Sequence, residues 1–94
     1  MTALCEADYA LPVLPPAKLD AVSTTIGNLI AEQIPDGACL QLGIGSIPDA
    51  VGMALKSKRH LGIHTEMLCD CYLDMYRAGK ITNKRKDIDR YKSV

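Results

Sequence analysis

The fold of this chain is decided by residues 38–66, which have the sequence ACLQLGIGSIPDAVGMALKSKRHLGIHTE. Over Ala38–Leu42 two leucines alternate with a cysteine and a glutamine, which predicts a short strand. Apolar residues recur at helical spacing over Ile47–Leu55, and Leu61–Glu66 is a second candidate strand. The order strand, helix, strand predicts parallel pairing in a βαβ unit and therefore an α/β fold class.

The helix of this unit is expected to begin at Ser46. Ser46 and Asp49 form a capping-box pattern, and Pro48 falls in the first turn, where its missing N–H is not needed. In a βαβ unit, the loop after the first strand and the end of the second strand lie at the same edge of the sheet, where α/β proteins bind ligands. Gly43–Ser46 and Thr65-Glu66 are therefore expected to converge.

An arm and a helix are expected before this unit. Residues 1–17 contain three prolines, which disfavour a helix or a central strand, so this segment is predicted to be an extended linker or arm. Over Leu19–Ile34 apolar residues lie three and four positions apart and form one helical stripe, which Pro35-Asp36-Gly37 ends.

A further helix is expected after the unit. It covers Asp70–Ala78, with Leu73 and Tyr76 facing inward, and Gly79 ends it. Ile81-Thr82 predicts the beginning of another strand.

The composition bounds the size and class of the protein. With 94 residues and neither Phe nor Trp, the chain can build one small domain with a thin core. Marginal stability, an oligomer or a larger parent protein is therefore expected. Eleven basic and eleven acidic residues balance, which argues against a dedicated nucleic-acid or anionic-membrane binder. No apolar run is long enough for a membrane span, so a cytoplasmic protein with four free thiols is expected.

The charges are unevenly distributed along the sequence. Residues 1–49 contain six acids and one base, whereas residues 80–94 contain six bases and two acids. The basic run Lys80–Lys86 fits a solvated charged face or a contact to phosphate.

Two sequence features could support chemistry. Gly43-Ile44-Gly45 lies between a strand and a helix, where backbone N–H groups can bind a phosphate or a developing oxyanion, although a tight turn would need the same glycines. Glu66 ends an apolar strand, where a carboxylate can be a nucleophile, a general base or a surface residue.

A metal site is not expected. If Leu61–Glu66 is extended, His60 and His64 lie about 13 Å apart, too far to share one ion. Cys69 and Cys71 match no common zinc spacing and fit free thiols better. His64 is interpreted as a half-buried strand residue or as a partner of Glu66.

Two longer motifs carry a family resemblance. Gln41–Val51, read as QLGIGxIPDAV, and His64–Met67, read as HTEM, strongly resemble the acetyl-CoA hydrolase/transferase family of glutamate-dependent CoA-transferases. This family includes 4-hydroxybutyrate CoA-transferase and butyryl-CoA:acetate CoA-transferase. Ile81–Lys86 fits the same pattern, and the likeness covers roughly residues 11–94.

The resemblance implies a site and a reaction. Glu66 would be the nucleophile that attacks an acyl-CoA thioester, and CoA would pass to a short-chain carboxylate through a glutamyl-CoA thioester. The backbone of Gly43-Ile44-Gly45, notably the Ile44 amide, would form the oxyanion hole and contact CoA. Coenzyme A would enter as the acyl-CoA substrate, with no metal, in a cytoplasmic homo-oligomer with a NagB/RpiA/CoA-transferase-like domain.

The resemblance also concerns how much of a family member this chain represents. Family members are several times longer, so residues 1–17 would be a linker between two halves and residues 18–94 the N-terminal part of the second half. Transfer or hydrolysis would then require the full-length parent. Two alternatives are a non-catalytic fragment with an association role and a phosphate- or nucleotide-binding α/β module. Cys69-Asp70-Cys71 stands where relatives often have Ser-Asp-Gly.

Overall fold

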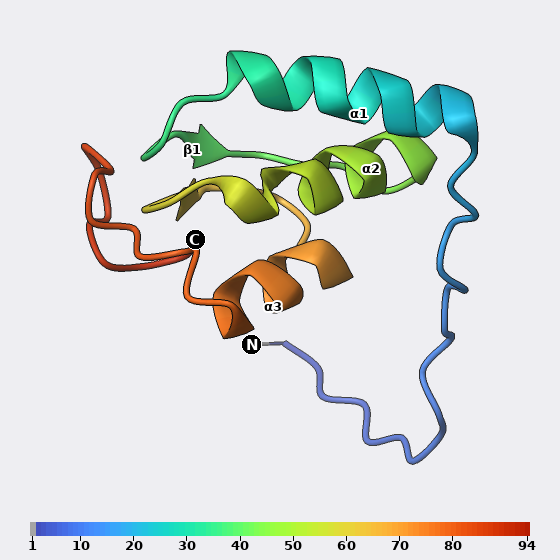
Figure 1. Cartoon of the computed structure of the whole chain (residues 1–94). Coiled ribbons are helices and arrows are strands. Elements are labelled where there is room, and N and C mark those ends of the chain that lie inside the picture. The colour runs from blue at the N-terminus through green and yellow to red at the C-terminus, as the bar shows by residue number, and fades with distance from the viewer. Residues whose placement is uncertain (1) are drawn as a thin grey trace.

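The computed structural model describes residues 2–94 and has a parallel α/β arrangement (Figure 1). Its elements in chain order are α1 (Ala21–Gln33), β1 (Cys39–Leu40), α2 (Ser46–Ala54), the 3-10 turn η1 (Leu55–Ser57), β2 (Gly62–Ile63) and α3 (Asp70–Arg77). β1 and β2 are parallel, with Cys39 opposite Gly62 and Leu40 opposite Ile63. The predicted βαβ unit is confirmed, although both strands are shorter than the sequence pattern indicated.

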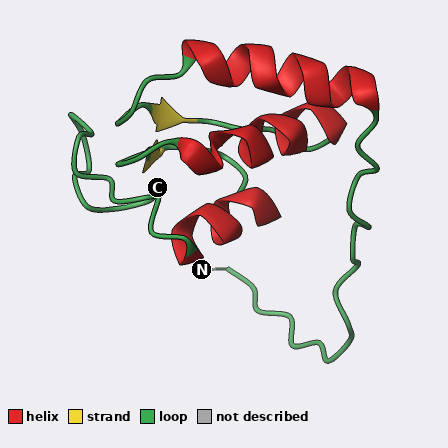
Figure 2. Ribbon diagram, viewed as in Figure 1, coloured by secondary structure: helices red, strands yellow, loops and turns green. Residues whose placement is uncertain are grey.

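A third segment lies beside β2. Leu61 and Ile81 form a parallel bridge, so the strand predicted to begin at Ile81 is present only as a single bridge. Figure 2 shows how little of the chain is strand, with loops connecting almost every element.

The core is small and lies between the strands, α2 and α3. Its most deeply buried large side chains are Leu55, Leu61, Tyr72 and Met75. The prediction that Leu73 and Tyr76 face inward is wrong, because these side chains are 45% and 66% exposed. The ring of Tyr72 and the flexible chain of Met75 fill the core instead, so α3 presents a different face than the sequence pattern indicated.

The fully buried residues of α1 are small, and its apolar stripe is at most partly buried. Its buried residues are Ser23, Gly27 and Ala31. A Cβ at Gly27 would lie 2.7 Å from the backbone carbon of Ala50, so α1 and α2 approach closely at this glycine. Half of the predicted stripe faces solvent, as the 57% exposure of Leu29 illustrates, and the other half is partly buried.

The predicted capping box at the start of α2 is wrong. Gly45, with φ of 124°, is the N-cap residue, and its carbonyl oxygen accepts a hydrogen bond from the Asp49 N–H at 3.1 Å. Ser46 is the first helical residue, and its hydroxyl accepts a hydrogen bond from Ser23 at 3.2 Å. Ser46 therefore joins α2 to α1, while Pro48 lies in the first turn as expected.

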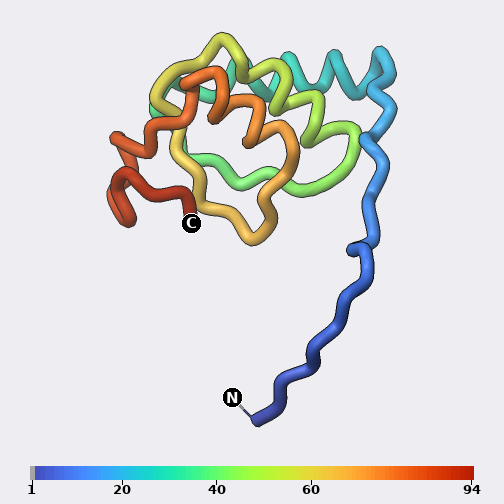
Figure 3. Tube along the Cα trace, turned by 90° about the horizontal axis from the view of Figure 1, so that it is seen from below, coloured from blue at the N-terminus to red at the C-terminus, as the bar shows by residue number. Residues whose placement is uncertain are grey.

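The beginning of the N-terminal arm extends away from this body (Figure 3). Residues 2–17 contain no helix or strand, and Leu11, Val13 and Leu14 are largely exposed. Met1, the first residue of the expected arm, lies outside the described residues. In the described part of the chain, no helix is long and apolar enough to cross a membrane.

Candidate functional site

The glycine loop, residues Gly43–Gly45, connects β1 to α2. Gly45 has φ of 124°, a conformation that other residues rarely adopt. A Cβ at Gly43 or Gly45 would meet nothing within 4 Å, and Ile44 is 56% exposed. The backbone of this loop is therefore open to a ligand beside the N-terminus of α2.

The glutamate loop, residues His64–Leu68, follows β2. The Thr65 hydroxyl donates a hydrogen bond to the Met67 carbonyl at 2.9 Å and closes a turn around Glu66. Glu66 is exposed and lies in this bend, past the last residue of β2. Since β1 and β2 are parallel, the glycine loop and the glutamate loop leave the sheet at the same edge.

Cys69 links the two loops. Its thiol donates toward the carbonyl oxygens of Gly43 at 3.2 Å and of Leu42 at 3.5 Å. Burial raises the pKa of Cys69, and the nearby negative charge of Asp49 raises it further. The thiol therefore stays protonated at neutral pH and remains a hydrogen-bond donor.

Cys71 lies two residues further on and has a different environment. Burial raises the pKa of Cys71 to about 11, with a smaller contribution from Cys69. Its side chain packs where a Cβ at Gly52 would be, 2.6 Å from that position. Both cysteines are free, as are Cys5 and Cys39, and Cys71 has a packing role.

Tyr72 supports the site from the core. It is 1% exposed, and its hydroxyl approaches Leu42 and the Thr65 side chain without completing a hydrogen bond. Burial raises the pKa of Tyr72, so its phenol is neutral behind the two loops.

The basic run near the C-terminus is not uniformly solvated. Lys84 and Arg85 are exposed, whereas Lys86 is 4% exposed. For Lys86, the sequence-based alternatives of a solvated face or a phosphate contact are both wrong. Its ammonium donates hydrogen bonds to the carbonyl oxygens of Ile63 and Lys92, both at 2.8 Å. Sequence reasoning missed this residue because a lysine in a charged run carries no signal of burial.

The two histidines lie on either side of β2, and the interpretation of His64 as a partner of Glu66 stays a prediction. His64 is exposed, so its interpretation as a half-buried strand residue is wrong. His60 lies at the turn before β2 with φ of 58°. Within residues 2–94 no group of three His, Cys, Asp or Glu side chains is arranged to hold a metal ion.

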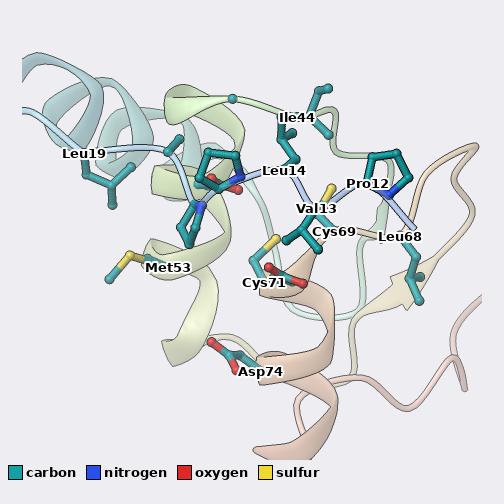
Figure 4. Close-up of a pocket in the computed structure, with 16 residues that line it drawn as sticks. Pro12, Val13, Leu14, Leu19, Ile44, Met53, Leu68, Cys69, Cys71 and Asp74 are labelled. Carbon is teal, nitrogen blue, oxygen red and sulfur yellow. The ribbon is translucent and has the colours of Figure 1, made fainter. Parts of the chain in front are cut away.

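An open cleft borders the glycine loop (Figure 4). One wall is the arm from Pro12 to Ala17, and the other contains Ile44, Gly45 and the segment Leu68–Cys71. Both thiols of that segment line the cleft, as Figure 4 shows. Glu66 is not among the lining residues, so the cleft approaches the site from the glycine side.

Comparison with curated proteins identifies relatives of high identity. The chain is 53% identical over 75 residues to the butyryl-CoA:acetate CoA-transferase of Anaerostipes caccae. This match covers 78% of this chain and 17% of that protein. It is 48% identical over 91 residues to the 4-hydroxybutyrate coenzyme A transferase of Clostridium kluyveri, covering 97% of this chain and 21% of that protein. The chain therefore spans about a fifth of the length of these relatives. No protein-family model matches the chain.

Solved structures match the fold as well. The crystal structure of 4-hydroxybutyrate CoA-transferase from Porphyromonas gingivalis is 46% identical with a TM-score of 0.77, covering 88% of this chain and 21% of that chain. RipA from Yersinia pestis is 44% identical with a TM-score of 0.81, covering 85% of this chain and 19% of that chain. Sequence and fold thus point to the same group of proteins.

Proposed function

Because this chain belongs by sequence and by fold to the CoA-transferase family, we propose that it is the segment of a longer CoA-transferase that carries the nucleophile, Glu66. Residues 18–94 would be the N-terminal part of the second domain, and residues 1–17 the linker that precedes it. The substrates would be an acyl-CoA and a short-chain carboxylate, as the names of the relatives suggest.

The proposed reaction has two symmetrical halves. The Glu66 carboxylate attacks the thioester carbonyl of acyl-CoA, which releases the CoA thiolate and leaves an acyl-glutamyl anhydride. The thiolate attacks the glutamyl carbonyl, which releases the first carboxylate and leaves a glutamyl-CoA thioester. The incoming carboxylate then attacks this thioester, and the reverse sequence transfers CoA to it and restores Glu66.

The juxtaposition of the two loops is the observation that carries this proposal. Glu66 is accessible and follows β2, and the open glycine loop follows its parallel neighbour β1. Cys69 bridges the two by its bond to Gly43. Nucleophilic attack on a thioester requires a carboxylate and a donor for the oxyanion that forms, and under this proposal the Ile44 amide is that donor.

Trapping of the covalent intermediate tests the proposal. The full-length protein that carries this segment is incubated with butyryl-CoA and then reduced with borohydride, which converts a glutamyl thioester to an alcohol. Peptide mass spectrometry is expected to locate the alcohol at Glu66, in a reaction that depends on butyryl-CoA. Rapid CoA transfer to acetate with no modification at Glu66 would contradict the proposed nucleophile.

The 94 residues alone are expected to show no transfer. Positioning of the reactants contributes on the order of 7–11 kcal/mol to such a step, and Glu66 here is exposed and lies outside the cleft that borders the glycine loop. The exposed apolar face of α1 favours association with another part of the protein or a second copy.

A further inference from the structure

On the side of β2 that is opposite β1, the backbone is hydrogen-bonded to the C-terminal segment, residues 80–94. The N–H groups of Gly62 and His64 donate to carbonyl oxygens on the β1 side. The N–H groups of Leu61, Ile63 and Thr65 donate to the opposite side. The acceptors on that side are, in order, the Lys80 carbonyl at 2.9 Å, the Asn83 Oδ1 at 2.9 Å and the Val94 carbonyl at 2.8 Å.

At Ile63, two side chains and one backbone group take the place of a neighbouring strand. The backbone group is the Val94 N–H, which donates to the Ile63 carbonyl at 3.4 Å. Asn83 has φ of 54°, which turns the chain away from the sheet, and its Oδ1 accepts the Ile63 N–H. The Lys86 ammonium donates to the Ile63 carbonyl at 2.8 Å. Both polar groups of this residue are thus satisfied on the side opposite β1, as an adjacent strand would satisfy them.

Both side chains are buried, so their polar groups need hydrogen-bond partners inside the protein. Asn83 is 6% exposed and Lys86 is 4% exposed. The Lys86 chain passes directly over Gly62, where a Cβ would lie 2.7 Å from its Cγ. A buried ammonium is unfavourable unless its hydrogen bonds are made, and the carbonyls of Ile63 and Lys92 accept them.

Glu66 lies close to this backbone along the chain. It lies in the bend three residues after Ile63, and its exposed side chain has no surrounding wall to orient it. We propose that Asn83 and Lys86 are positioning residues for Glu66, which hold the carboxyl end of β2 so that the carboxylate faces the glycine loop. The assignment rests on the proposed function only for the role of Glu66.

Hydrogen–deuterium exchange and kinetics on the full-length protein test the assignment. Lys86→Met keeps an unbranched side chain as far as Cε and removes the ammonium group, and Lys84→Met is the matched control in the exposed part of the same run. We expect Lys86→Met to increase amide exchange in residues 63–67 at least tenfold, with α1 unchanged. We also expect kcat for CoA transfer to fall about ten- to a hundredfold with little change in the KM for acyl-CoA, because a small misplacement of a reacting group has such an effect.

A second pair of variants covers the case in which Lys86→Met does not fold. Asn83→Gly tolerates the positive φ and removes the acceptor for the Ile63 N–H, whereas Asn83→Asp retains it. Asn83→Gly is expected to reproduce the exchange and kcat effects, and Asn83→Asp to restore most of both.

The outcomes separate this inference from the proposed function. Equal exchange in Lys86→Met and Lys84→Met, or an increase spread evenly over α1 and the glutamate loop, would overturn the positioning role. Equal amide exchange and equal kcat in Asn83→Gly and Asn83→Asp would also overturn the positioning role. If the wild-type protein transfers no CoA, the proposed function fails, and the exchange comparison still decides whether the pair holds the end of β2.

Discussion

The glycine loop and the glutamate loop leave the same edge of the sheet but are built in opposite ways. The glycine loop is shaped by its own backbone, with Gly45 at φ of 124° and open space around both glycines. The glutamate loop is shaped by partners far along the chain, since Asn83 and Lys86 hold the strand that leads into it. One half of the site is therefore local in sequence, whereas the other half depends on long-range contacts.

The largest effect is expected in the glutamate loop itself. Glu66→Ala should reduce CoA transfer by the full-length protein to background, because no other carboxylate in the loop can form the covalent intermediate. Glu66→Asp should retain about a hundredth of the wild-type rate, since the carboxylate is withdrawn by one methylene. Steady-state transfer from butyryl-CoA to labelled acetate measures both variants.

A folding control accompanies these variants. Glu66 is exposed, so neither substitution should change the thermal unfolding midpoint. Transfer at the wild-type rate in a folded Glu66→Ala protein would mean that the active part of the site lies elsewhere.

The two loops also differ in how far the sequence could predict them. The alternation before Gly43 and the helical spacing after it specified the βαβ unit and the position of the glycine loop, because these are local patterns. The sequence also placed Glu66 at the correct edge. It did not predict the roles of Cys69, Asn83 and Lys86, since hydrogen bonds across 20 or more residues leave no periodic signal.

The packing faces of α1 and α3 depend on the surfaces that they meet. α1 meets α2 at Gly27, because close approach of two helices selects a small residue. The inward face of α3 was taken from Leu73, but the volume available in the core selected Tyr72 and Met75. In both helices, the shape of the neighbouring surface outweighed hydrophobicity.

An intermediate effect is expected in the glycine loop. Gly45→Ala places a methyl group where nothing lies within 4 Å, so any loss of stability comes from the φ of 124° alone. Such a conformation is unfavourable for alanine by about 1–3 kcal/mol. Chemical denaturation of the full-length protein should show a decrease of that size in the free energy of unfolding.

Gly43→Ala is the matched control for this prediction. The added methyl group also meets open space, but the φ of Gly43 lies outside the positive range. Its free energy of unfolding should stay within about 0.5 kcal/mol of the wild type, as for other surface substitutions. If the two variants were equally stable, the backbone conformation of Gly45 would not be what shapes the loop.

The smallest effect is expected at the contact between the loops. Cys69→Ala removes the thiol that donates toward the carbonyls of Gly43 and Leu42. A hydrogen bond of this kind is worth little on its own, so kcat should fall only about three- to tenfold. Cys71→Ala removes a thiol of the same size two residues away that packs against Gly52, and it should leave kcat closer to the wild type.

Conservative replacement and pH distinguish a hydrogen bond from packing at Cys69. Cys69→Ser retains a donor and should recover most of the rate lost in Cys69→Ala. Because the pKa of Cys69 is raised from its ordinary value of 9.0, the thiol donates throughout the neutral range and loses its proton only at higher pH. The advantage of the wild type over Cys69→Ala should therefore be constant from pH 6 to pH 8 and decrease as the thiol ionises. A rate advantage that is lost in the serine variant, or one that does not change when the thiol ionises, would mean that Cys69 joins the two loops by its volume and not by its proton.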